Sequence, residues 1–99
     1  MIRSVHVISR KALRLFWERH PDSKEALLRW IKIVRRTRFR NSLELRDVFP
    51  SADPVGDWVV FNIHGDKYRL VTSIHFNRGE VYVRHVLTRA ECSRGSWKR

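Results

Sequence analysis

Basic, aromatic and amide side chains share one phase of a β-sheet predicted for the second half of the chain. Alternate residues of a strand point to the same face. This phase collects Asn62, His64, Lys67, Arg69, Ser73, His75, Tyr82, Arg84 and Thr88. Guanidinium groups form bidentate hydrogen bonds with phosphates, and aromatic rings stack on unpaired bases. The face is therefore predicted to bind RNA.

The same region contains the groups that metal-independent RNA cleavage requires. Such cleavage needs a base for the 2′-hydroxyl proton, a cation beside the crowded phosphate and an acid for the leaving 5′-oxygen. The candidate cations are Arg69, Arg84 and Arg89. The candidates for proton transfer are His64, His75 and Glu91. A solvated turn residue is the alternative interpretation of His64, since many surface histidines have no catalytic role.

Other reactive side chains give weaker signals. His85 falls on the core-facing phase of its strand and is expected to be a buried, hydrogen-bonded histidine. Tyr82 either stacks on a base or packs against its neighbours. Cys92 has no identified base that would activate it as a nucleophile. Five histidines without close spacing and a single cysteine predict neither a metal site nor an internal disulfide, and no cofactor is expected.

Two hairpins are predicted to position the polar face. The strands are Trp58–His64, Lys67–Phe76 and Glu80–Thr88, with turns at Gly65–Asp66 and Arg78–Gly79. In the first hairpin this register pairs Phe61 with Leu70 and Asn62 with Arg69. In the second it pairs Ile74 with Val83, His75 with Tyr82 and Leu70 with Leu87. The preceding residues 51–57 are expected to form a loop, because they contain Pro54 and Gly56.

The first half of the chain predicts a strand followed by helices. The expected strand is Ile2–Ile8, and the expected helices are Ser9–Arg19, a second one starting at Asp22 or Ser23, and a brief Ser42–Val48. The second helix has an apolar stripe at Leu27, Trp30, Ile31 and Val34. Its opposite side is rich in arginine. That side is either a solvated surface or a docking face for an acidic partner segment or for nucleic acid.

Composition sets the class of the protein. A chain of 99 residues with 42% hydrophobic residues supports one domain over residues 1–99. The formal charge of +11, with 16 arginines among the 21 basic residues, favours phosphate-rich partners. No apolar run of about 20 residues and no signal-peptide core are present, so we expect a cytoplasmic protein without a membrane partner. Residues 93–99 are expected to form a disordered basic tail.

Five short stretches of this sequence occur together in a known family. They are Val7–Leu13, Leu45–Ser51, Val59–Ile63, Lys67–Val71 and Tyr82–Arg84. In this combination and order, the chain resembles HigB-type toxins, the RelE-like mRNA interferases of type II toxin–antitoxin modules. The resemblance implies an α+β, RelE/ParE-like fold in which two N-terminal helices pack on one face of a small, mainly antiparallel sheet. It also implies cleavage of mRNA, often on the ribosome, and neutralisation by a HigA-like helix-turn-helix antitoxin, through which alone operator DNA would be contacted.

The C-terminal part departs from this family. The family's closing motif is similar to Thr-His-x-Glu-Tyr-Asp, whereas this chain reads Thr88-Arg89-Ala90-Glu91-Cys92-Ser93. Arg89 can stabilise phosphate charge, but a guanidinium does not exchange protons near neutrality. Two alternatives therefore remain beside the nuclease. One, which this departure suggests, is a catalytically weakened translation inhibitor that binds RNA or the ribosome. The other, which rests on fold analogy alone, is a ParE-like topoisomerase inhibitor.

Overall fold

The computed structural model describes residues 6–37, 40–95 and 97. Its strands are β1 (His6–Ile8), β2 (Asp53–Val55), β3 (Trp58–Ile63), β4 (Tyr68–His75) and β5 (Glu80–Thr88). Its α-helices are α1 (Arg10–Arg19), α2 (Lys24–Arg36), α3 (Ser42–Val48) and α4 (Arg89–Arg94), and a 3₁₀ turn, Pro21–Ser23, precedes α2. The strand predicted from Ile2 is seen from His6 onward, since residues 1–5 lie outside the described part.

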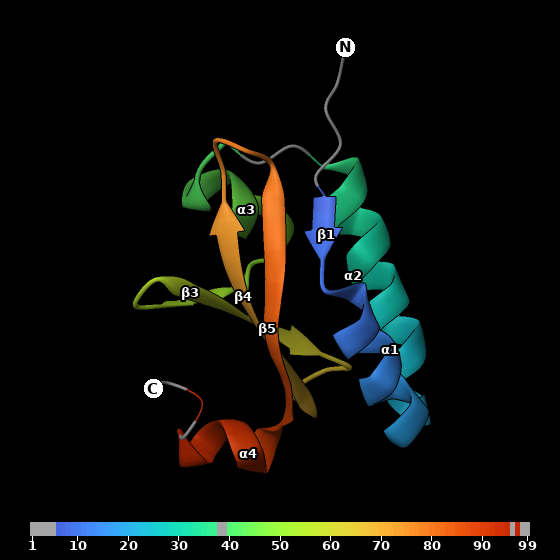
Figure 1. The fold of residues 1–99 in the computed structure, drawn as a ribbon. Coiled ribbons are helices and arrows are strands. Elements are labelled where there is room, and N and C mark those ends of the chain that lie inside the picture. Colours follow the sequence, from blue (N-terminus) through green and yellow to red (C-terminus); the bar gives the residue numbers. More distant parts are fainter. Residues whose placement is uncertain (1–5, 38–39, 96, 98–99) are drawn as a thin grey trace.

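One five-stranded sheet organises the chain. The strand order is β1-β5-β4-β3-β2, in which β1 runs parallel to β5 and all other neighbours are antiparallel. In Figure 1, α1 and α2 lie beside β1 on one side of the molecule, and α4 follows the far end of β5. The predicted α+β fold with a mainly antiparallel sheet is confirmed.

The main core lies between the sheet and the first three helices. The predicted stripe of α2 is buried, as are Leu13 and Phe16 of α1. These side chains recur at helical spacing, so each helix presents one apolar side to the sheet. Phe61 of β3 meets the rings of Trp30 and Phe49, with centroids 5.4 and 5.0 Å away. This layer fixes which side of the sheet remains open.

The first hairpin keeps the predicted register. Phe61 pairs with Leu70 and Asn62 with Arg69, as expected. The turn uses the four residues from His64 to Lys67 rather than two. His64 and Gly65 both have positive φ, 56° and 68°. The four-residue turn accommodates this backbone conformation. The same residues face each other as predicted, so the side chains of β3 and β4 point to the expected faces of the sheet.

The second hairpin does not keep the predicted register. Ile74 pairs with Val81 and His75 with Glu80, because the turn takes the four residues 76–79. A two-residue hairpin turn of type I′ needs positive φ at both central residues. Gly79 has φ 64°, but Arg78 is not among the residues with positive φ. The predicted pairs Ile74–Val83 and His75–Tyr82 were therefore wrong.

A β-bulge then changes the phase of the last strand. Thr72 pairs with Val83 and Val71 with His85, which leaves Arg84 as an extra residue in β5. One inserted residue turns every following side chain to the other face. Val86 accordingly packs against the main core, whereas Leu87 joins a separate cluster with Val60 and Val71. The prediction that His85 faces the core was wrong, and so was the pairing of Leu70 with Leu87.

Two elements were not predicted. The expected loop at residues 51–57 contains the edge strand β2, where Pro54 is tolerated because an edge strand has unpaired N–H positions. Helix α4 begins at a Thr-x-x-Glu sequence, which is the signature of a capping box. The segment expected as a disordered tail begins within α4, and Trp97 packs at 7% exposure against Val60 and Val71. Residues 96, 98 and 99 lie outside the described part.

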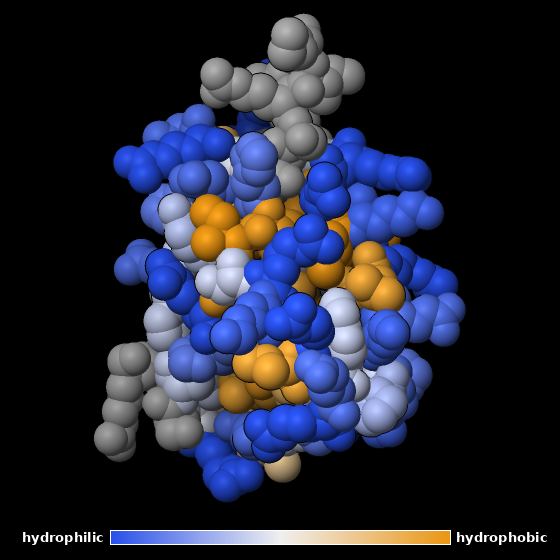
Figure 2. Space-filling model, turned by 45° about the vertical axis from the view of Figure 1, so that its right-hand side comes forward, coloured by the Kyte–Doolittle hydropathy of each residue, from blue (hydrophilic) through white to orange (hydrophobic). Residues whose placement is uncertain are grey.

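The surface on the helical side is strongly polar. Figure 2 shows mainly hydrophilic side chains there, interrupted by small hydrophobic groups. The large exposed apolar residues include Leu15 of α1 and Leu28 of α2. Within residues 6–37, 40–95 and 97, no helix has the length and apolar character needed to cross a membrane.

Candidate functional site

The sheet face opposite α1 and α2, here termed the open face, carries alternate residues of three strands. From β3 and β4 it presents Asn62, Arg69, Ser73 and His75, and from β5 it presents Tyr82, His85 and Leu87. Most of the side chains predicted to form the polar face are therefore brought together. The bulge adds His85 and Leu87 to them, and it turns Thr88, which was predicted for this face, to the side of its partner Tyr68.

Tyr82 is the centre of the first group on the open face. The ring of His75 meets it edge to face, with centroids 5.2 Å apart. The guanidinium of Arg84 lies 5.2 Å from the centroid of the Tyr82 ring. Arg84 is exposed and forms no ion pair with any residue that the structure describes. The group thus combines a stacking surface with an uncompensated cation.

A second group forms at the turn between β3 and β4. Arg69 donates from Nη1 to the carbonyl oxygens of Asp66, at 2.7 Å, and Tyr68, at 3.1 Å. Arg89 donates from Nη1 to Oδ2 of Asp66 at 3.1 Å, between side chains that are 66% and 69% exposed. An ion pair this exposed contributes at most about 1 kcal/mol, so a phosphate can displace the carboxylate. Two predicted arginines are therefore close together and available to an anion.

Thr88 and Glu91 form the start of α4. Thr88 donates its backbone N–H to Oε1 of Glu91 at 2.8 Å, and Oγ1 of Thr88 accepts the backbone N–H of Glu91 at 3.2 Å. The bond from the Thr88 backbone is the main cause that lowers the pKa of the Glu91 carboxyl. A carboxylate held in this way is a weak proton acceptor. Both residues have a structural role beside the roles predicted for them.

A cavity of about 350 Å³ lies between α4 and the open face. It is lined by His85, Leu87, Glu91, Arg94 and Trp97. The rings of Trp58 and Trp97 stack with centroids 5.6 Å apart, and Trp97 Nε1 donates to the carbonyl oxygen of Cys92 at 2.9 Å. The ring of His85 meets Trp58 edge-on at 5.8 Å. An imidazole, a carboxylate and a guanidinium thus share one partly apolar cavity.

Comparison with known proteins places this geometry in a family. Residues 23–94 match the family model described as HigB toxin, RelE-like toxic component of a toxin–antitoxin system. The "mRNA interferase toxin HigB" of Escherichia coli K12 is 31% identical over 90 residues, which cover 88% of this chain and 86% of that protein. The "mRNA interferase HigB" of E. coli O6:H1 is 26% identical over 90 residues, with 88% and 87% coverage.

The chain belongs to the HigB toxin family. This membership confirms the sequence-based prediction of a RelE-like toxin, and the relatives named as interferases confirm the prediction of endoribonuclease activity. A toxic component of a toxin–antitoxin system also has an antitoxin as its partner.

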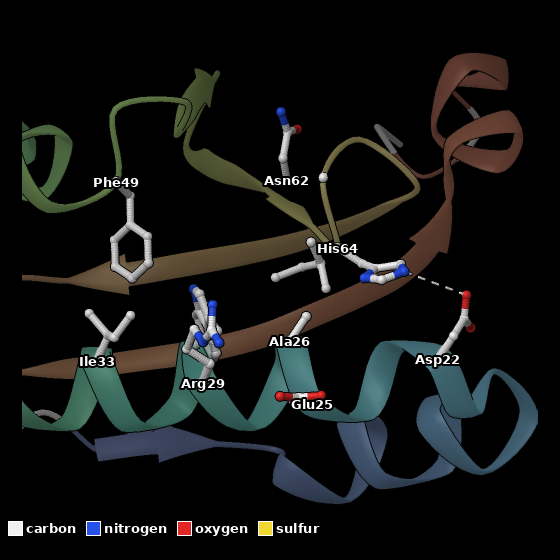
Figure 3. Close-up of a pocket in the computed structure, with 11 residues that line it drawn as sticks. Asp22, Glu25, Ala26, Arg29, Ile33, Phe49, Asn62 and His64 are labelled. Carbon is white, nitrogen blue, oxygen red and sulfur yellow. Dashed lines mark ion pairs between the residues drawn. The ribbon is translucent and has the colours of Figure 1, made fainter.

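In this HigB-family chain, His64 and Lys67 lie away from the open face. Lys67 Nζ is 2.5 Å from Oδ2 of Asp22, Tyr68 donates its hydroxyl to Oδ1 of Asp22 at 2.6 Å, and His64 Nε2 is 3.9 Å from Oδ2. Figure 3 shows His64 directed towards Asp22, whereas Asn62 points away from α2. His64 and Asp22 line a cavity of about 450 Å³, which also includes Arg29 of α2. The turn therefore separates two residues from the predicted RNA face.

Asp22 is expected to make stability depend on acid pH. The hydrogen bonds from Lys67 and Tyr68 lower the pKa of Asp22 from an ordinary 3.8 to about 2. Because the folded-state pKa is depressed, the stabilisation is complete above about pH 4 and is lost as the pH falls towards 2. Asp22→Asn should therefore lower the melting temperature at pH 7, and the difference from wild type should shrink between about pH 4 and 2.

Thermal unfolding followed by circular dichroism across this pH range tests the role of Asp22. The control is Asp47→Asn, because Asp47 is exposed on α3 and has no ion pair with a described residue. A difference between wild type and Asp22→Asn that stays constant from pH 7 to about pH 2 would contradict the linkage.

Sequence reasoning missed Asp22, His85, Arg94 and Trp97 as members of these clusters. The Thr-x-x-Glu signature could have revealed α4, and with it the position of Arg94. Nothing in the local sequence marks Arg84 as a bulge, so the sequence could not predict the face of the sheet to which His85 points. Among the residues that the structure describes, no three His, Cys, Asp or Glu side chains are grouped so that they could hold a metal ion.

Proposed function

We propose that this HigB-family toxin cleaves mRNA and that the substrate strand lies on the open face. Relatives of this chain are named as mRNA interferases. The observation that carries the placement is Arg84, an exposed guanidinium that lies beside the Tyr82 ring and forms no ion pair with a described residue. Arginine and an aromatic ring next to one another hold a phosphate and an adjacent base of single-stranded RNA.

Each group on the open face has a role in this proposal. Arg84 stabilises charge on the scissile phosphate, while Tyr82 and His75 contact a base. Arg69 and Arg89 hold a neighbouring phosphate once it displaces Asp66, and Asn62 offers amide hydrogen bonds from β3. Thr88 and Glu91 keep α4 against this surface. His64 and Lys67 are assigned to the Asp22 cluster and have no direct RNA contact here.

A second function of the same fold is favoured by the C-terminal residues. Arg89 stands where the family motif has a histidine, and the Glu91 carboxylate is engaged in the helix cap. Both features weaken proton transfer without weakening RNA binding. The alternative is therefore a toxin that inhibits translation by occupying RNA or the ribosome. The HigB matches favour either of these over the ParE-like topoisomerase inhibitor.

Cleavage and binding are separated by incubating the purified toxin with mRNA in EDTA, with and without ribosomes. Cleavage should leave a 2′,3′-cyclic phosphate or 3′-phosphate, because the attacking 2′-oxygen needs no metal. Products of this kind would support the nuclease, and a larger yield with ribosomes would place the reaction in translation. Tight binding that leaves the RNA intact under both conditions would support the alternative.

We also propose that the antitoxin is HigA-like, with a helix-turn-helix fold and an acidic segment that covers the basic surface. The charge of +11 supports this kind of partner, since opposite charge steers association. In the assay above, adding such a protein encoded beside this gene should abolish cleavage, and more antitoxin should be needed at high salt. Inhibition that does not change with salt would contradict the electrostatic contact.

A further inference from the structure

We infer that His85 is the general base of the cleavage reaction, the group that takes the proton of the attacking 2′-hydroxyl. This inference rests on the proposed function and names a catalytic residue for it.

The bulge at Arg84 brings His85 to the open face. Regular pairing from Val83 onward would turn its side chain towards the helices. Instead His85 pairs with Val71 and shares its face with Leu87. Arg84 is the inserted residue itself. It is exposed and lies one position before His85. In this proposal the cation that holds the phosphate and the imidazole that takes the proton are consecutive residues of β5.

The ring of His85 is held in place but its nitrogens are not used. Trp58 contacts the ring at 5.8 Å and Trp97 at 6.5 Å between centroids. His85 forms no hydrogen bond or ion pair with another described residue, although it is only partly exposed. It also lines the 350 Å³ cavity beside α4. Its ring nitrogens are not buried, so they are open to solvent and to a substrate hydroxyl.

The other candidate bases are less suitable. Glu91 lines the same cavity, but its carboxylate accepts the Thr88 backbone N–H, which lowers its pKa. His64 lies beside Asp22, and the ring of His20 stacks on Phe16 with centroids 4.5 Å apart. Histidine changes its charge between pH 5 and 8 and serves as a base near neutrality. His75 meets the Tyr82 ring edge to face and is assigned to base contact. His85 is thus the imidazole that lines this cavity.

The cleavage step needs neither a metal nor an added reagent. The 2′-oxygen forms a bond to phosphorus while its proton passes to the imidazole of His85. The bond from phosphorus to the 5′-oxygen breaks, and that oxygen leaves with a proton from solvent or from an acid on the open face. The products are a 2′,3′-cyclic phosphate and a 5′-hydroxyl. Arg84 and Arg94 offer positive charge to the phosphate during this step.

The test is His85→Gln, which keeps the size and polarity of the side chain but cannot accept the proton. Removal of a general base typically lowers rates by about 10²- to 10⁴-fold, so the single-turnover rate should fall at least about 100-fold. RNA affinity, measured by fluorescence anisotropy, and the melting temperature should stay near those of wild type. The matched control is His6→Gln, because His6 is exposed on β1 and belongs to neither RNA-binding group.

A pH profile of the single-turnover rate supplies a readout that a structural role would not change. The wild-type rate should rise with pH, since only neutral imidazole accepts a proton. His85→Gln should lose this rise. The titratable and charged groups near the imidazole are Glu91, Cys92 and Arg94 of α4 and Arg84 of β5. Glu91→Gln should keep the rise, which separates the two side chains of the cavity.

Chemical rescue keeps the inference testable if glutamine disturbs the cavity. His85→Ala should be inactive alone and should regain cleavage when imidazole is added. A wild-type rate and unchanged pH profile in His85→Gln would overturn the inference while leaving the proposed function intact. RNA that wild-type toxin leaves uncleaved, with and without ribosomes, would overturn both.

Discussion

Replacing Arg84 by alanine is expected to lower the rate of RNA cleavage by about 10²- to 10³-fold, the loss typical of removing one transition-state donor. Arg84 is exposed, has no ion pair with a described residue and lies over the Tyr82 ring. Its charge is therefore available to the phosphate without breaking an ion pair with a described residue. For the same reason the alanine variant should fold normally.

Two further variants show whether the geometry of Arg84 matters. Arg84→Lys keeps the charge but loses the planar pair of donors, so it should recover only part of the rate. Arg46→Ala removes the same charge from an exposed position on α3 and should leave the cleavage rate unchanged. The single-turnover rate of cleavage is measured on the same RNA for Arg84→Ala, Arg84→Lys and Arg46→Ala. Equal losses in Arg46→Ala and Arg84→Ala would mean that net charge alone binds RNA and that the open face has no specific role.

Replacing Phe61 by alanine is expected to destabilise the fold by about 3–5 kcal/mol, the range for deleting a buried aromatic ring. Phe61 is 2% exposed on β3, where it pairs with Leu70 of β4. Its ring packs edge-on against Trp30 of α2 and against Phe49 after α3. The substitution would leave a cavity between β3, α2 and the residue that follows α3.

Urea unfolding followed by tryptophan fluorescence measures the free energy of unfolding of Phe61→Ala. The control is Leu43→Ala, because Leu43 is 77% exposed and should change stability by no more than about 0.5 kcal/mol. A loss below about 1 kcal/mol for Phe61→Ala would contradict the position of this ring in the core.

The capping box explains part of the resemblance at the C-terminal end of the chain. Thr88 and Glu91 are the two positions that agree with the family's closing motif, and both are required for the start of α4. Agreement at these positions preserves the helix that closes one side of the 350 Å³ cavity. The motif differs at residues 89, 92 and 93. Substitutions at these positions change the chemistry of the site but leave the capping box in place. His85 then provides an imidazole from the neighbouring strand.

Much of the fold follows from local patterns. The apolar stripe at Leu27, Trp30, Ile31 and Val34 recurs with helical spacing and therefore fixes the buried side of α2. The alternation in Trp58–Ile63 sets the phase of β3, and the short turn after it leaves one register for the first hairpin. The Arg-rich composition likewise indicates phosphate as a ligand, because charge is a property of residue types alone.

The candidate site depended on contacts between residues far apart in the chain. Lys67 was expected beside Arg69, but Asp22, 45 residues earlier, holds it on the helical side. His85 was expected in the core, but the bulge at Arg84 turned it to the open face. A bulge forms where the pairing of two strands must adjust to their turn and twist. The free energy of such an adjustment depends on the whole sheet, so the sequence of one strand could not predict the bulge.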